Sequence, residues 1–242
     1  MPYIRWMKEP NPLTQCILST CSFVLLLWCI KSAEILFSLN MDGLGVYPLH
    51  WPGALGILTA PLVHGSLAHL FSNTLPLLIL GSILLYGYPR SRFRVLAFIW
   101  LVSGMGVWLF ARQANHIGAS GLSHGIFFFL FVISILRRDR SSVAIMMIAF
   151  LMYGGMTMTI FPREPGISFE YHFFGALSGV IAAFLWYKRD PKPVEKRYFW
   201  EDREEPDDPV IGEQWRDDIV STESEKQGIT SGSAEDAPQR LH

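Results

Sequence analysis

Polar side chains that could act together in acyl-transfer chemistry occur within long apolar stretches of the 242-residue chain. Ser120 lies in the small-residue segment GASGLSHG, and His172 lies in HFFGALSG. A serine hydroxyl becomes a nucleophile when a base within hydrogen-bond reach takes its proton, and a histidine can return that proton to a leaving amine. His69 and Asn73 are four residues apart, so they share a helix face and could donate hydrogen bonds to an oxyanion. These residue types indicate nucleophilic chemistry by a serine and a histidine.

No carboxylate is placed to complete a Ser–His–acid triad. The apolar stretches hold no aspartate, and Glu34 lies three residues after Lys31, a spacing that favours an ion pair on one helix face. This pair falls near a helix end, where a lysine can extend its ammonium group to the membrane surface. Glu170 lies two residues before His172, in an expected loop or first helical turn. The sequence therefore predicts a Ser–His dyad, with the backbone N–H of Ser120 as one oxyanion donor.

The segments that carry these residues are predicted to be membrane-spanning helices. Half of the residues are hydrophobic and 17% are charged, and the mean hydropathy is +0.28. A spanning helix needs about 20 predominantly apolar residues. Six runs meet this requirement, at about 15–38, 61–86, 93–111, 120–136, 142–160 and 167–187. The predicted fold class is an all-α polytopic membrane protein with a six-helix core over 15–188.

Arginine and lysine residues predict the orientation of this bundle. The basic segments are the N-terminal flank 1–14, the turns 87–94 and 137–140, and the pair 188–189. The opposite connectors are poor in basic residues: 40–60, 112–118 and 162–167. With six spans, all the basic segments share one side. Because basic residues accumulate on the cytoplasmic side of membrane proteins, both termini are predicted to be cytoplasmic.

The C-terminal segment 189–242 differs in composition from the rest of the chain. Of the 21 acidic residues, 15 lie from Asp190 onward. A polar segment with few apolar residues to bury stays disordered by default, so 189–242 is predicted to be an acidic, disordered cytoplasmic tail. The chain has no basic face that would indicate nucleic-acid binding. The three cysteines, Cys16, Cys21 and Cys29, lack the spacing of a zinc site, and neither a metal nor a cofactor is expected.

The predicted topology brings the polar residues to one depth in the membrane. The second, fourth and sixth runs all enter from the outer side. At about 1.5 Å of rise per residue, Ser120, His172, His69 and Asn73 all fall within the outer half of the bilayer. Ionisable groups at such a depth are costly and indicate function. A site built from them is expected to lie in a water-filled cavity that opens to the outer face.

Three motifs resemble those of the rhomboid family of intramembrane serine proteases. GASG (118–121) is similar to the family's GxSG, and HGSLAHLFSN (64–73) to its pattern of His, then His five residues later, then Asn four after that. HFFGALSG (172–179) is similar to its His-x-x-Gly-x-x-x-Gly. The resemblance covers about residues 10–188 and is to the six-span prokaryotic type of rhomboid protein. It implies the rhomboid bundle as the fold.

The resemblance implies a role for each matching residue. Ser120 would attack the scissile carbonyl, and His172 would act as general base and then as general acid. His69, Asn73 and the backbone N–H groups around Ala119 would bind the oxyanion. Further matching positions are implied to be structural or to adjoin the dyad: His64, Gly118, Gly121, His124, Gly125, Gly175 and Gly179. The four glycines of the fourth and sixth runs would let these two helices approach closely.

Three positions depart from the family pattern. The family's Trp-Arg before the second span is absent from ALGILTAPLVH, and Tyr171 precedes the base where a small residue is usual. His124 stands where the family commonly has an aromatic ring that stacks on the base. An imidazole there can stack on His172 or form hydrogen bonds. These departures leave the dyad intact and concern substrate preference and pH optimum.

The function implied by the resemblance is a serine endopeptidase that forms an acyl-enzyme. It would cleave transmembrane or membrane-proximal peptide bonds near the outer face, and the expected location is a bacterial cytoplasmic membrane. The alternative is a catalytically silent rhomboid-like protein that binds transmembrane clients. A small transporter would require polar residues along the inner halves of the spans, which are apolar. Packing is the competing interpretation for His64 and Ser123, while His50 and His116 are expected to be solvated or interfacial loop residues.

Overall fold

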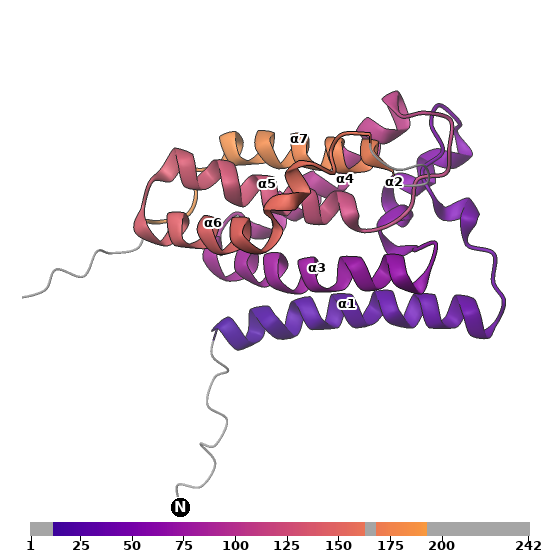
Figure 1. Cartoon of the computed structure of the whole chain (residues 1–242), viewed down its shortest axis with the longest axis horizontal. Coiled ribbons are helices and arrows are strands. Elements are labelled where there is room, and N and C mark those ends of the chain that lie inside the picture. The colour runs from indigo at the N-terminus through magenta and orange to yellow at the C-terminus, as the bar shows by residue number, and fades with distance from the viewer. Residues whose placement is uncertain (1–11, 163–167, 193–242) are drawn as a thin grey trace, which may run out of the picture. The chain divides into compact units, whose positions relative to one another are not determined.

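The computed structural model describes residues 12–162 and 168–192, which form a bundle of long helices (Figure 1). The long helices are α1 (Pro12–Leu36), α3 (Leu67–Gly87), α4 (Arg92–Phe110), α5 (Ser120–Arg137), α6 (Arg140–Tyr153) and α7 (Phe169–Trp186). The 3-10 turn η4 (Gly154–Thr157) continues α6, and within the described ranges there are six apolar segments long enough to cross a membrane. No β-strand occurs in those ranges. The predicted all-α fold with six spanning helices is confirmed.

The termini predicted from composition lie largely beyond the described residues. Residues 1–11 of the N-terminal flank and residues 193–242 of the acidic tail are outside them, and so are residues 163–167 of the connector before α7.

The second spanning helix begins later than its apolar run. The prediction places its start near residue 61, whereas α3 begins at Leu67. The hydroxyl of Ser66 caps this helix by accepting a hydrogen bond from the backbone N–H of His69, with an N–O distance of 3.0 Å. Short helical segments occupy the preceding residues: η2 (Pro52–Leu55), α2 (Gly56–Thr59) and η3 (Ala60–Leu62). His64, predicted in the first turn of the span, therefore lies in the loop before it.

Successive long helices run in opposite directions, with the result that the bundle has two distinct ends (Figure 1). We call the end where α1 begins and α7 finishes the basic end; it also holds the α3–α4 and α5–α6 turns. We call the opposite end the site end, because α3, α5 and α7 all begin there. Which side of the membrane each end faces remains a prediction from the distribution of arginine.

α5 is the central helix of the bundle, and its closest neighbour is α7. Of the α5 segment 72% is buried, against 11% for the segment formed by α6 and η4. A Cβ added to Gly175 would lie 2.8 Å from the carbonyl carbon of Gly121, and one added to Gly179 would lie 2.9 Å from that of Gly125. Both distances are shorter than the 3.4 Å at which ordinary contact begins. Glycine at these positions therefore allows the two backbones to touch.

Two polar residues are more buried than the sequence suggested. Lys31 forms the predicted ion pair with Glu34 at an Nζ–Oε1 distance of 2.9 Å, but its side chain is only 7% exposed. The pairing satisfies the ammonium group inside the bundle, so Lys31 does not extend to a membrane surface. His116, expected to be solvated or interfacial, is 1% exposed. The reason is that its backbone pairs with that of Val46, which joins the α4–α5 connector to the loop after α1.

Candidate active site

A cavity of about 720 Å³ opens among the residues that the motifs singled out. It lies at the site end, between the first turns of α3, α5 and α7 and the segment after η4. Its lining includes both members of the predicted dyad, Ser120 and His172, and both predicted oxyanion side chains, His69 and Asn73. Four residues from three separate helices thus share one cavity.

The turn before α5 places Ser120 at the start of that helix. Gly118 has a φ of +108°, and an added Cβ would lie 2.6 Å from Cε1 of His69, so this position requires glycine on both counts. The Gly118 N–H donates to the carbonyl of Ala60 at 2.9 Å, which attaches the turn to η3. As the first residue of α5, Ser120 lies where backbone N–H groups have no helical acceptor. The turn therefore presents the Ser120 hydroxyl beside backbone N–H groups that have no acceptor within the helix.

The contact between α5 and α7 brings Ser120 and His172 to the same level. A Cβ on Gly121 would lie 3.0 Å from the carbonyl oxygen of Tyr171. Gly121 follows Ser120 and Tyr171 precedes His172, so this backbone contact lies directly beside the dyad. The two side chains form no hydrogen bond with each other in the structure. Catalytic hydrogen bonds are often long in substrate-free sites and shorten when substrate binds.

Thr159 determines which nitrogen of His172 carries a proton. The Nδ1 atom of His172 lies 3.0 Å from the carbonyl oxygen of Thr159. A carbonyl oxygen can only accept, so Nδ1 is the protonated nitrogen of the neutral ring and Nε2 keeps its lone pair. His172 is therefore held in the tautomer that a general base requires, without a carboxylate.

His124 contacts both members of the predicted dyad. Its ring stacks on the ring of His172, with centroids 4.0 Å apart and planes inclined by 9°. Its Nδ1 atom donates to the carbonyl oxygen of Ser120 at 2.7 Å, which leaves Nε2 to accept from the Thr159 hydroxyl at 2.7 Å. The two possibilities raised by the sequence, stacking and hydrogen bonding, are both realised.

The predicted oxyanion side chains differ in how far they are engaged. Asn73 donates from Nδ2 to the carbonyl oxygen of His69 at 3.1 Å, which leaves its second amide N–H for another acceptor. The His69 ring packs edge-on against His64, with centroids 5.1 Å apart. Both residues line the cavity together with Ser120. Their positions allow hydrogen bonding to an anion that forms beside the serine.

The backbone N–H of Ala119, to which the resemblance assigns a role in oxyanion binding, has a partner in the structure. It donates to Nε2 of His64 at 3.3 Å, and Ala119 is fully buried. A buried donor with a partner cannot turn to a new acceptor unless the loop moves. His64 therefore holds the turn that presents Ser120, which agrees with the structural role implied by the resemblance.

Several residues around the site were missed or misjudged from the sequence. Thr159 follows η4 and matches no motif, so no signal in the sequence marked it. The buried ring of His116 contacts the Ser168 hydroxyl at 2.6 Å, and this hydroxyl caps α7 by accepting from the backbone N–H of Tyr171 at 3.2 Å. Glu170 lies in the first turn of α7, within the region the sequence predicted for it, and pairs with Arg112 at 3.3 Å. These contacts fix the start of α7, where His172 lies.

Comparison with known proteins agrees with the motifs and the fold. Residues 52–189 match the model of the Rhomboid domain. A protein of Mycobacterium tuberculosis strain H37Rv, described as uncharacterized, is 35% identical over 174 residues, which cover 68% of this chain and 72% of that protein. An uncharacterized protein of Mycobacterium leprae strain TN is 32% identical over 173 residues, with 68% of each chain covered. The chain belongs to the rhomboid family.

Proposed function

We propose that the protein is an intramembrane serine endopeptidase that uses Ser120 and His172 as its dyad. The observation that carries the proposal is the shared cavity, which is lined by a serine, a histidine and two further hydrogen-bonding side chains. Membership of the rhomboid family supports it, because rhomboid proteins are generally serine intramembrane proteases. The substrates would be transmembrane or membrane-proximal segments, cleaved near the outer face of a bacterial cytoplasmic membrane.

In the proposed reaction His172 first acts as a base. Its Nε2 lone pair takes the proton of the Ser120 hydroxyl as Oγ attacks the scissile carbonyl, and the ring then protonates the leaving amine. Water enters the cavity, and His172 takes a proton from it as the water oxygen attacks the acyl carbonyl. The imidazolium then returns this proton to Oγ of Ser120 as the ester bond breaks and the carboxylic acid product leaves. The Thr159 carbonyl stabilises the imidazolium that forms in both steps, because it accepts from Nδ1–H.

The oxyanion is proposed to bind between α3 and the start of α5. The donors are the backbone N–H of Ser120, the free N–H of the Asn73 amide and the ring of His69. The positive end of the α5 dipole favours negative charge at the same place. Removal of one donor from such an arrangement typically lowers kcat by about 10²–10³-fold.

The segment formed by α6 and η4 is the proposed route for the substrate. It is the least buried of the six spanning segments, and Met156 of η4 and Thr159, two residues after η4, border the cavity. In the rhomboid family the fifth span acts as a gate for the substrate, and the resemblance implies the same role for this segment. A transmembrane substrate could therefore reach Ser120 by displacing the outer end of α6 without disturbing the α5–α7 contact.

Cleavage of a model transmembrane substrate in proteoliposomes tests the proposal. Ser120→Ala and His172→Ala are each expected to reduce cleavage to the background rate while the protein remains in the membrane. Ser123→Ala is the matched control, because it removes a hydroxyl one turn deeper in the same helix, and it is expected to retain most of the rate. Cleavage that persists in Ser120→Ala would contradict the proposal. No cleavage by the wild-type protein, together with retention of the substrate, would favour the silent client-binding alternative.

A further inference from the structure

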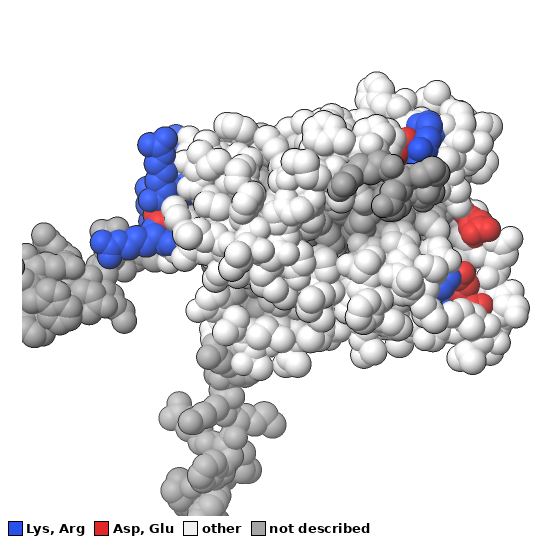
Figure 2. Space-filling model, in the orientation of Figure 1, with Lys and Arg blue, Asp and Glu red and all other residues white. Residues whose placement is uncertain are grey.

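Basic side chains gather at the basic end of the bundle, far from the candidate active site (Figure 2). Three of them, Arg90, Arg94 and Arg189, line an open pocket of about 660 Å³ together with Phe93. Arg90 belongs to the α3–α4 turn, Arg94 to the first turn of α4, and Arg189 follows α7. We call this feature the arginine pocket. Its residues come from two segments that are about a hundred residues apart in the sequence, so the fold must bring them together.

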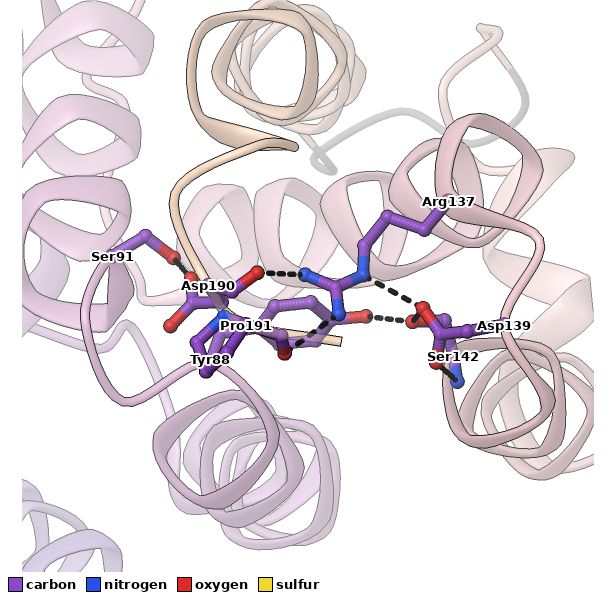
Figure 3. Close-up of polar contacts among 7 residues, drawn as sticks. All are labelled: Tyr88, Ser91, Arg137, Asp139, Ser142, Asp190 and Pro191. Atoms are coloured by element: carbon purple, nitrogen blue, oxygen red, sulfur yellow. Dashed lines mark hydrogen bonds and ion pairs between the residues drawn. The ribbon is translucent and has the colours of Figure 1, made fainter. Parts of the chain in front are cut away.

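A buried carboxylate, that of Asp190, joins the segment after α7 to the α3–α4 turn, as its contact with Ser91 in Figure 3 illustrates. Asp190 is 4% exposed, and it accepts hydrogen bonds from the backbone N–H of Arg90 at 2.6 Å and from the Ser91 hydroxyl. Arg137 donates to the backbone carbonyls of Asp190 and Pro191 at 2.8 and 3.0 Å. Because Asp190 directly follows Arg189, these bonds keep Arg189 beside the α3–α4 turn.

The charge of the arginine pocket is not neutralised within the described residues. The single carboxylate of Asp190 balances at most one of the three positive charges, and its oxygens bond to the backbone N–H of Arg90 and the Ser91 hydroxyl, not to a guanidinium group. Arg137 forms an ion pair with Asp139, with an N–O distance of 2.8 Å. Burial raises the pKa of the Asp139 carboxyl, but the hydrogen bonds from Arg137 and Ser142 lower it by more, so this pKa lies below its ordinary value and Asp139 is charged. Within 12–162 and 168–192, no ion pair involves the three arginines of the pocket. Three like charges side by side favour the binding of an anion.

The apolar wall of the pocket indicates what kind of anion would fit. Phe93 is 67% exposed, and beyond it the outer surfaces of α4 and α7 are apolar, with Leu185 58% exposed. The pocket thus lies where the apolar flank of a spanning bundle meets its polar end. This is the depth of phospholipid headgroups, and basic pockets between spanning helices bind anionic headgroups. A lipid would place its phosphate among the arginines and its glycerol and acyl chain against Phe93.

We propose that Arg90, Arg94, Arg189 and Phe93 form a binding site for the phosphate-bearing headgroup of an anionic phospholipid. The site does not depend on the proposed proteolytic activity and would be present in a silent protein as well. It assigns Asp190 the role of a structural anchor that keeps Arg189 in the pocket. It also explains how three arginines that form no ion pair within the described residues can lie together at this end of the bundle.

Native mass spectrometry of the full-length protein in detergent tests the site. The probes are phosphatidylglycerol and phosphatidylcholine with the same acyl chains, and the wild-type protein is expected to retain phosphatidylglycerol preferentially. The variant Arg94→Gln/Arg189→Gln is expected to bind phosphatidylglycerol about 25-fold more weakly, from roughly fivefold per arginine near an anionic surface. The matched control is Arg138→Gln/Arg140→Gln, which removes two exposed charges from the α5–α6 turn at the same end and should bind as the wild type does.

Three outcomes of this mass spectrometry experiment would overturn the proposal. One is the absence of a preference for phosphatidylglycerol in the wild type, and another is equal weakening in the pocket variant and the control. The third is displacement of phosphatidylglycerol by an equal concentration of inorganic phosphate, which would show that a soluble anion is sufficient. A photoreactive Phe93→benzoylphenylalanine variant identifies the occupant directly in membranes. A lipid adduct supports the proposal, and an adduct with a peptide from 193–242 would assign the pocket to the acidic segment.

Discussion

Replacement of Gly175 by alanine should slow catalysis because it forces α7 away from α5. The new Cβ would lie 2.8 Å from the carbonyl carbon of Gly121, whereas ordinary contact begins at 3.4 Å. The obstacle is backbone, which cannot rotate aside, so the helices must separate by the difference, at least about 0.6 Å. Overpacking of this kind typically costs about 1–3 kcal/mol of stability.

The displacement would act directly on the proposed dyad. Gly175 lies one turn after His172, and Gly121 follows Ser120, so the separation moves the base away from the nucleophile. Because a misplacement of about 1 Å can cost about 10²-fold in rate, we expect kcat/KM of Gly175→Ala to fall by roughly 10- to 100-fold.

The assay is cleavage of a model transmembrane substrate, measured beside the thermal unfolding of each variant in detergent. Gly43→Ala is the control, since a Cβ at Gly43 would meet nothing within 4 Å, and it should match the wild type in both measurements. A folded Gly175→Ala variant with the wild-type rate would refute the argument that the glycine contact positions the dyad. A variant that loses stability but cleaves normally once folded would refute it equally.

Three further substitutions test other contacts of the structure. His124→Phe keeps a ring against His172 but removes the hydrogen bonds to Ser120 and Thr159. Cleavage should therefore persist, but with a shifted pH profile. An unchanged pH profile would exclude a role for His124 in tuning the pH dependence of cleavage. Glu34→Gln leaves the buried ammonium of Lys31 without its partner and should lower the free energy of unfolding by about 1–3 kcal/mol. This loss is smaller than the loss expected for a fully buried ion pair, because Glu34 is 21% exposed. Adding Lys31→Met to the same variant should restore most of the lost stability, and an unchanged thermal unfolding temperature in Glu34→Gln would contradict the prediction. His116→Phe removes the contact with Ser168 at the start of α7 and should lower kcat more than it changes KM, whereas a pure KM effect would argue against a role in positioning His172.

Much of the architecture could be predicted from local properties of the sequence. Apolar runs of spanning length predicted six helices, because a bilayer requires each helix to satisfy its own backbone hydrogen bonds. The apolar run predicted from residue 120 matches the start of α5 at Ser120. The start of α3 was placed too early, because hydropathy alone did not distinguish the short helical segments before Ser66 from the spanning helix that this residue caps.

The parts of the site that could not be predicted depend on contacts between distant segments. Thr159 contacts His172 through its backbone carbonyl and His124 through its hydroxyl. Neither group can be recognised as part of a site from the sequence, because every residue has a carbonyl and threonine hydroxyls are common. The engagement of the Ala119 amide by His64 depends on how the loop before α3 folds against the turn before α5. His116 is buried because of the pairing with Val46, which lies some seventy residues earlier in the chain. Motif spacing identified the residues, but only the fold shows which of their hydrogen-bonding groups remain free.

The central claim is that Ser120 is an activated nucleophile, and labelling by a fluorophosphonate probe tests it most directly. Mass spectrometry of the labelled full-length protein in detergent should locate the adduct on Ser120. Labelling should be lost in His172→Ala and retained in Ser123→Ala. Failure of the probe to modify Ser120, under conditions where it labels an active rhomboid protease, would contradict the account.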